Sequence, residues 1–138
     1  ISRTFFCGVG RPTNRQKELY RHALDEIEHN LSLVCDGVTL EEFGERAFVQ
    51  PEVFHHNQYS CICHGVGMCD EAPKIYYPKD RAEKGYPGTL RENMVICLES
   101  YVGAVGERDG VKLEQQVRVT KDGYELLSTN PLESDLLD

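Results

Sequence analysis

The amino-terminal part of the chain carries apolar residues at the spacing of an α-helix. Thr13, followed three residues later by Gln16, forms a capping-box signature, so we expect a helix to begin there. A row of apolar residues at this period buries one face of a helix, and the row consists of Leu19, Ala23, Leu24, Ile27, Leu31 and Val34. The pair Asp36-Gly37 ends the pattern and, with it, the predicted helix.

Shorter elements are predicted around this helix. Residues 1–6 ("ISRTFF") are expected to form a strand. Thr39 and Glu42 make a second capping box, and Pro51 stops the helix that they begin. From there on the apolar runs become short and are separated by Gly and Pro, with a polar loop expected over residues 76–90. Helices followed by strands indicate an α+β domain of two helices and an antiparallel sheet, here spanning residues 1–138.

Two of the predicted strands place acidic residues face to face. Side chains alternate in "VICLESYV" (residues 95–102), so Glu99 shares a face with apolar neighbours. In "VKLEQQVRV" (residues 111–119) one face is apolar and the other is polar, and the polar face consists of Lys112, Glu114, Gln116 and Arg118. If the bend between the strands is symmetric, Glu99 and Glu114 lie opposite each other.

Like charges in that position destabilise a strand pair, and two explanations fit. Either both glutamates lie on a solvated face where Lys112 and Arg118 neutralise them, or a metal cation joins the two carboxylates. His64 would then be a fitting third ligand. Its other explanation is an ordinary hydrogen-bonded core histidine, held in "CHGVG" where glycines let the backbone approach other groups closely.

The cysteines beside His64 do not have the spacing of a structural zinc site. Cys61, Cys63, His64 and Cys69 lack the paired knuckles of such sites, and Cys61 and Cys63 fit better as small hydrophobes on one face of a strand. The chain has six cysteines in total. We expect most of them to be buried thiols rather than a disulfide framework.

Composition and charge narrow the class of protein. The chain has 138 residues, 40% of them hydrophobic, which suffices for one globular domain. Its formal charge of -8 argues against nucleic acid or an anionic membrane as the default partner. With no apolar run long enough for a membrane span and no signal segment, a cytoplasmic location is predicted. Because the chain begins at Ile1 rather than Met, we expect it to be a fragment.

Four motifs in order give a resemblance to a known family. "ISRT", "HGVGMCDEAP", "GTLRENMVICLE" and "GVKLEQQVRVTKDGYELL" resemble the carboxy-terminal half of the creatinase, aminopeptidase P and prolidase superfamily, the pita-bread metalloenzymes. The resemblance spans nearly all of the chain. It implies a curved antiparallel sheet and a dinuclear metal centre. By position, His64, Glu99 and Glu114 correspond to three metal ligands of the family, with Glu114 bridging two metals.

One departure from the family pattern points to a particular branch. Proline-directed peptidases of the superfamily usually carry a second histidine where this chain has Asp70, just before Glu71. That change resembles the branch that cleaves dimethylsulfoniopropionate to dimethyl sulfide and acrylate. The resemblance implies that Asp70 is the catalytic base and that Tyr59 lies near the substrate, while Glu71 is an outer-shell partner, a general acid-base residue or a loop charge. An Xaa-Pro metallopeptidase and a non-catalytic pita-bread module are the alternatives.

The resemblance also implies a cofactor and partners. Carboxylate and imidazole ligands suit iron, which the resemblance favours, as well as manganese, cobalt or zinc. The substrate would be a small zwitterionic sulfonium carboxylate, and the complete protein would be a homodimer. The family's aspartate ligands precede "ISRT". We therefore expect these 138 residues alone to bind metal weakly and to have little activity.

Overall fold

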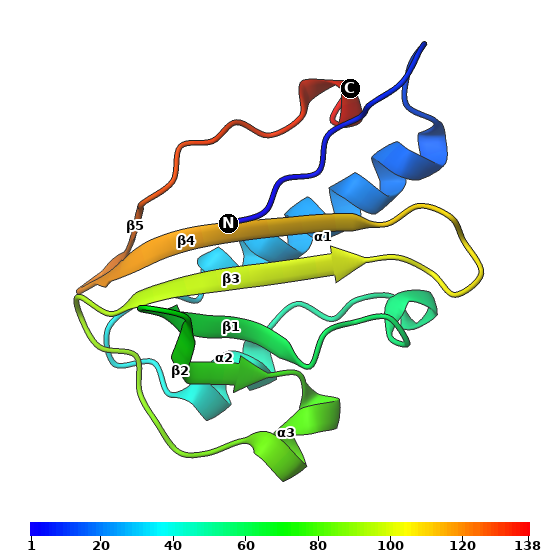
Figure 1. Cartoon of the computed structure of the whole chain (residues 1–138). Helices are drawn as coiled ribbons and strands as arrows, with labels where there is room; N and C mark the ends of the chain where they lie inside the picture. The colour runs from blue at the N-terminus through cyan, green and yellow to red at the C-terminus, as the bar shows by residue number, and fades with distance from the viewer.

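The second half of the chain forms a five-stranded antiparallel sheet, and two helices from the first half lie behind it (Figure 1). The computed structural model describes all 138 residues. The α-helices are α1 (Asn14–Leu31), α2 (Leu40–Arg46) and α3 (Pro78–Lys84). The strands are β1 (Cys61–Val66), β2 (Asp70–Tyr76), β3 (Val95–Val102), β4 (Val111–Thr120) and β5 (Gly123–Leu126), in the spatial order β2-β1-β3-β4-β5. Single 3₁₀ turns lie at Glu52–Phe54 and Ser134–Leu136. The α+β class with an antiparallel sheet is confirmed.

Helix α1 begins at the predicted capping box. The Gln16 backbone N–H donates to the Thr13 hydroxyl at 3.2 Å, and the Thr13 N–H donates to the Gln16 side chain at 2.9 Å. The helix ends at Leu31, earlier than the apolar pattern suggests. After it, Leu33 and Val34 bond to carbonyls three residues back, which tightens the last turn into 3₁₀ geometry while both side chains stay buried.

Helix α2 also begins as predicted, with the Thr39 hydroxyl accepting from the Glu42 N–H at 3.1 Å. The prediction that it continues to Pro51 is wrong. Ala47 turns to an extended conformation, with ψ of 155°. The next N–H, that of Phe48, then donates to the buried Asn30 side chain of α1 at 2.9 Å instead of to a helical carbonyl. Tertiary contact thus ends this helix before proline does.

The strand pair β3 and β4 has the predicted register. Val102 lies opposite Val111 across a symmetric bend, so Glu99 lies opposite Glu114. Alternation gives the sheet two unlike faces. We call the face that carries these glutamates the front face, and the face covered by α1 the rear face. Helix α1 packs against β3 and β4. Every second residue of β4 faces the rear, and these residues are buried.

A polar cluster is buried between α1 and the rear face. The Glu26 carboxylate of α1 is fully buried and accepts hydrogen bonds from Gln50, Tyr77 and Ser100. We call these four residues the rear polar cluster. Burial raises the pKa of Glu26 and outweighs the three hydrogen bonds that lower it. The cluster links α1, the segment after α2, the residue between β2 and α3, and strand β3.

The expectation of a strand over residues 1–6 is wrong in its detail. The segment runs extended beside β4 and is held there by mixed contacts rather than by a backbone ladder. Glu114 donates its N–H to the Ser2 carbonyl at 3.1 Å, and the Thr4 hydroxyl exchanges hydrogen bonds with the Lys112 backbone. The Arg3 guanidinium donates to the Glu114 carbonyl and to the Gln115 side chain. Because side chains make most of these bonds, no regular strand forms.

The predicted polar loop over residues 76–90 contains a helix. Pro78 stands at the first position of α3, where its missing N–H costs nothing. The Lys84 ammonium pairs with Asp80 one turn earlier at 2.9 Å. These local signals suffice for seven helical residues, none of which is buried.

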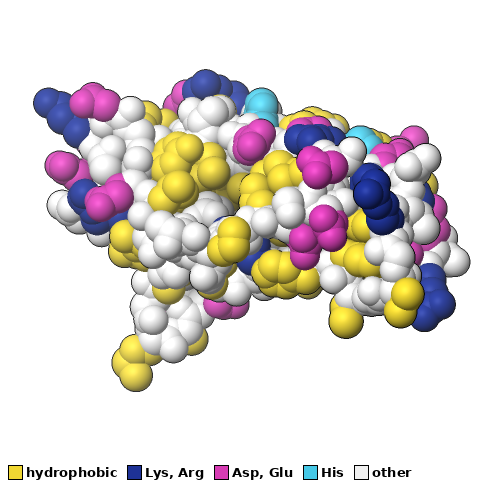
Figure 2. All heavy atoms as spheres, turned by 90° about the horizontal axis from the view of Figure 1, so that it is seen from above, with side chains coloured by type: hydrophobic (Ala, Val, Ile, Leu, Met, Phe, Trp, Pro, Cys, Tyr) yellow, Lys and Arg dark blue, Asp and Glu magenta, His cyan; other side chains and the backbone are white.

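The surface carries both signs of charge. Figure 2, which views the molecule from above, shows acidic and basic side chains mixed over this face with apolar side chains exposed between them. None of the helices combines the length and the hydrophobicity that a membrane crossing needs.

Candidate metal centre

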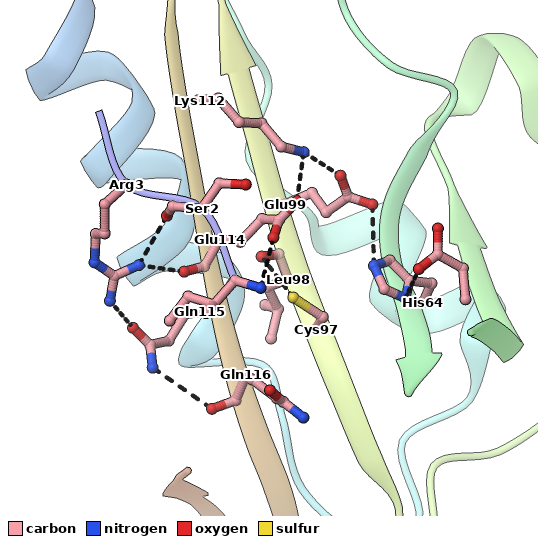
Figure 3. A network of polar contacts seen from close by, with 12 residues as sticks. Ser2, Arg3, His64, Cys97, Leu98, Glu99, Lys112, Glu114, Gln115 and Gln116 are labelled. Atoms are coloured by element: carbon pink, nitrogen blue, oxygen red, sulfur yellow. Dashed lines mark hydrogen bonds and ion pairs between the residues drawn. The ribbon is translucent and has the colours of Figure 1, made fainter. Parts of the chain in front are cut away.

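Three strands bring the predicted metal ligands together on the front face. Glu99 of β3 lies opposite Glu114 of β4, and His64 of β1 lies opposite the neighbouring Cys97 of β3. The His64 Nε2 atom is 3.3 Å from a carboxylate oxygen of Glu99. Figure 3 shows the two glutamates and the imidazole directed toward one another from these strands. A cavity of about 240 Å³ is lined by all three side chains and by Asp70.

Lys112 occupies the position between the two carboxylates. Its ammonium donates to Glu99 and lies 3.0 Å from a carboxylate oxygen of Glu114 (Figure 3). Burial acts to lower the pKa of Lys112, but the two carboxylates outweigh it and raise the pKa. Burial acts to raise the pKa of Glu114, but the hydrogen bond and charge of Lys112 act against it, and the pKa is lowered. Glu114 therefore favours its ionised form.

The neutralising role predicted for Lys112 is therefore found, whereas that of Arg118 is not. The Arg118 guanidinium donates to Glu125 of β5 at 2.9 Å and to Asn93 at 2.9 Å. The pattern of alternating faces placed Lys112 beside Glu114. It did not show that one ammonium would contact both glutamates.

The imidazole of His64 is oriented by the backbone of its own strand, β1. Its Nδ1 lies 2.9 Å from the Gly65 carbonyl oxygen, and in the tautomer that donates this hydrogen bond Nε2 presents a lone pair toward Glu99. Ligand atoms about 2.1 Å from one ion lie about 3.0–3.4 Å apart. The separation of 3.3 Å between Nε2 and the Glu99 oxygen fits that geometry.

The donor types and their shared face therefore fit a divalent cation, but the full ligand set is not assembled. Nowhere in the structure do three imidazole, thiol or carboxylate groups converge as closely as a metal site requires. The Lys112 ammonium fills the place between Glu99 and Glu114. The roles of His64, Glu99 and Glu114 as metal ligands stay predictions.

Asp70 and Glu71 lie at different places. Asp70 begins β2 at the edge of the cavity, with its side chain 75% exposed and its carboxylate 3.6 Å from Nδ1 of His64. Glu71 accepts the Met68 N–H at 3.0 Å and covers Gly67, so it closes the turn between β1 and β2 and does not line the cavity. Of these two acids, Asp70 is thus the one that can reach a molecule in this cavity.

The pairing of β1 with β2 depends on a close approach that only glycine allows. A Cβ atom at Gly65 would lie 2.1 Å from the Ala72 carbonyl oxygen. The expectation that glycine beside His64 permits close backbone contact is confirmed.

Tyr59 and Tyr101 form an aromatic pair at the Lys112 end of the centre. Their rings stack with centroids 5.4 Å apart and 14° between planes. The Lys112 ammonium lies 4.2 Å from the Tyr59 ring centroid, within the range of a cation–π contact. Tyr59 does not line the cavity itself. Its link to the metal centre is its contact with the Lys112 ammonium.

The cysteines are all free thiols, as expected, but fewer are buried than predicted. Cys63 and Cys97 are buried, whereas Cys7 and Cys69 are exposed. Burial, together with the charge of Glu114, raises the pKa of Cys97 to about 12, so this cavity-lining thiol stays protonated at neutral pH.

Comparison with known proteins identifies the family. The family model of metallopeptidase family M24 matches residues 1–121. The chain belongs to this family. Among curated relatives of this M24 chain, dimethylsulfoniopropionate lyase DddP of Roseovarius nubinhibens is 38% identical and DddP of Roseobacter denitrificans is 32% identical. Each alignment covers 99% of this chain and 31% of the relative.

Solved structures show the same fold. The X-Pro aminopeptidase from Thermotoga maritima superposes with a TM-score of 0.72 at 24% identity, covering 90% of this chain and 34% of that one. The prolidase from Pyrococcus furiosus gives 0.69 at 26% identity, covering 91% and 36%. The pita-bread fold is confirmed, and the M24 chain spans about a third of the length of the relatives it matches.

Proposed function

We propose that this M24 protein is a metal-dependent carbon–sulfur lyase that cleaves dimethylsulfoniopropionate to dimethyl sulfide and acrylate. The similarity to two proteins named as dimethylsulfoniopropionate lyases supports this assignment. The observation that carries it is Asp70 at the edge of the cavity, beside His64, where a second histidine would suit a peptidase. An exposed carboxylate at that position can act as a base without binding the metal.

The residues divide the work of a β-elimination. Asp70 takes the proton from the carbon next to the substrate carboxylate. The electron pair of that C–H bond forms the carbon–carbon double bond, and the carbon–sulfur bond breaks with its electrons going to sulfur. The products are acrylate and neutral dimethyl sulfide. Tyr59, whose ring already faces a cation, holds the sulfonium by cation–π attraction.

A divalent cation would be held by His64, Glu99 and Glu114, with iron as the proposed metal and manganese, cobalt or zinc as alternatives. When bound, it stabilises the negative charge that develops on the substrate carboxylate. Glu114 is proposed to bridge two metals. Glu71 keeps Asp70 in place through the turn that it closes. The complete enzyme is proposed to act as a homodimer in the cytoplasm on a small zwitterionic substrate.

An Xaa-Pro metallopeptidase is the second candidate. Two relatives named Xaa-Pro dipeptidase, from Pyrococcus horikoshii and Pyrococcus furiosus, are 29% and 28% identical to this chain. They share the family but are less similar than the two lyases. A non-catalytic module is the third candidate, because Lys112 can balance the front carboxylates without a metal.

A product assay separates these candidates. The full-length protein loaded with Fe²⁺ or Mn²⁺ is supplied with dimethylsulfoniopropionate or with an Xaa-Pro dipeptide, and headspace dimethyl sulfide and free proline are measured. The lyase assignment predicts dimethyl sulfide and no proline release. Proline release alone would favour the peptidase, and neither product would favour the non-catalytic module.

The role of Asp70 has its own control. Replacing it (Asp70→Asn) should lower dimethyl sulfide release by about a hundredfold or more while metal content is unchanged. Asp122→Asn, the same change at an exposed turn, should leave release unaltered. Loss of bound metal in the Asp70 variant would instead make Asp70 a ligand or a structural residue.

A further inference from the structure

The front carboxylates share one internal cation. Glu99 and Glu114 lie directly opposite each other, where two like charges repel. Both side chains are about 15% exposed, so solvent screens that repulsion only in part. The Lys112 ammonium contacts both carboxylates and, on its other side, the ring of Tyr59. It is therefore the side chain that makes this arrangement stable without a metal.

We propose that Lys112 is an exchangeable counter-ion, which holds Glu99 and Glu114 in place and gives up that position to a divalent cation. The inference rests on the proposed metal site and adds to it a residue that is not a ligand. An ammonium and a divalent cation cannot occupy the space between the same two oxygens, so each binds at the expense of the other. Lys112 is thus a positioning residue that sets metal affinity.

The surroundings of Lys112 suit such an exchange. A lysine ammonium is a point charge on a flexible four-carbon stem, so it can move while its backbone stays paired in β4. Arg118, the next cation on the same face, cannot take over because it is bound by Glu125 and Asn93.

Mn²⁺ binding to the full-length protein tests the exchange, because free and bound Mn²⁺ differ in their electron paramagnetic resonance spectra. The variants are Lys112→Gln, which removes the competing charge, and Lys112→Arg, which keeps it. Lys121→Gln is the matched control, since it removes one positive charge from the exposed β4–β5 turn. Lys112→Gln should bind Mn²⁺ about tenfold more tightly than wild type. Lys121→Gln should change the affinity less than about twofold, and Lys112→Arg should bind no more tightly than wild type.

Thermal melting distinguishes exchange from a merely structural role. Without metal, Lys112→Gln should melt at a lower temperature than Lys121→Gln, because two facing carboxylates have lost their shared cation. With saturating Mn²⁺ the difference should disappear. If Lys112 had a purely structural role, Lys112→Gln would lower the melting temperature by the same amount with and without the metal.

The outcomes separate this inference from the proposed site. If wild type binds Mn²⁺, Glu114→Gln abolishes binding, and Lys112→Gln binds with unchanged or weaker affinity, the exchange is wrong while the metal site stands. If wild type binds no Mn²⁺, or Glu114→Gln binds as well as wild type, the proposed metal site is wrong and the exchange with it.

Discussion

Two neighbouring residues of β3 point to carboxylates in very different surroundings on the two faces of the sheet. Glu99 points to the front face, where it and Glu114 line a cavity and share the Lys112 ammonium. Ser100 points to the rear face, where it donates to the fully buried Glu26. The front carboxylates have a cation for a partner, and the rear carboxylate has only neutral donors.

The difference shows what each face can do. Burial raises the pKa of Glu26, so this carboxylate favours its proton and works as a hydrogen-bonding centre for packing. On the front face, Lys112 lowers the pKa of Glu114, and two carboxylates opposite each other are suited to bind a cation. The carboxylate that serves packing and the carboxylates suited to bind a cation thus lie on opposite faces of the same sheet.

The largest expected effect lies on the rear face. Glu26→Ala leaves the donors of Gln50, Tyr77 and Ser100 unpaired in the core, so the free energy of unfolding should fall by about 3 kcal/mol in denaturant titrations. Glu28→Ala, an exposed position on the same helix, should leave it almost unchanged. Equal losses in both variants would show that the rear polar cluster contributes no stability of its own.

The raised pKa of Glu26 has a consequence for pH. In the folded state this carboxyl holds its proton above the pH at which it ionises in the unfolded chain, near 4.5. Its contribution to stability is therefore fully present below that pH and is lost as pH rises through the folded pKa, with a slope of up to about 1.4 kcal/mol per pH unit. Lys112 across the sheet opposes the shift, and Tyr77 is the ionisable group in contact with Glu26.

Glu26→Gln cannot ionise and should lack this component of the pH dependence. In unfolding measurements at intervals from pH 4 upward, the free energy of unfolding of wild type should therefore fall relative to that of the variant as pH rises. Parallel curves over the whole range would mean that the pKa of Glu26 is not raised.

A smaller effect is expected where β3 meets the rear polar cluster. Ser100→Ala removes one hydrogen bond to Glu26 and should lower the free energy of unfolding by about 1 kcal/mol. Tyr101→Phe, the next residue on the other face, loses only a hydroxyl without a hydrogen-bond partner in the chain and should be neutral. A Tyr101→Phe variant less stable than Ser100→Ala would contradict the assignment of the stabilising hydrogen bonds to the rear face.

The sequence predicted the front face better than the rear. Alternation and the symmetric bend were enough to place Glu99 opposite Glu114, because β-strand period and antiparallel register are local rules. Helical periodicity left out Glu26, since a charged residue beside an apolar row is normally solvated and its three donors come from distant segments.

Contacts that depend on irregular backbone were also beyond local rules. Asp70 reaches His64 through a strand pair whose register shifts between His64 and Gly65, so neither side-chain period nor loop length gives their distance. Residues 1–6 failed as a strand because their bonds to β4 come from the side chains of Arg3 and Thr4.

Metal content in carboxylate variants tests the central claim that the front face is the metal centre. Full-length wild type, Glu99→Gln, Glu114→Gln and Glu26→Gln are purified alike, and bound iron and manganese are measured by elemental analysis. The account predicts that the two front variants lose their metal and that the rear variant retains it. Equal metal content in all four proteins, or loss confined to the Glu26 variant, would contradict the account.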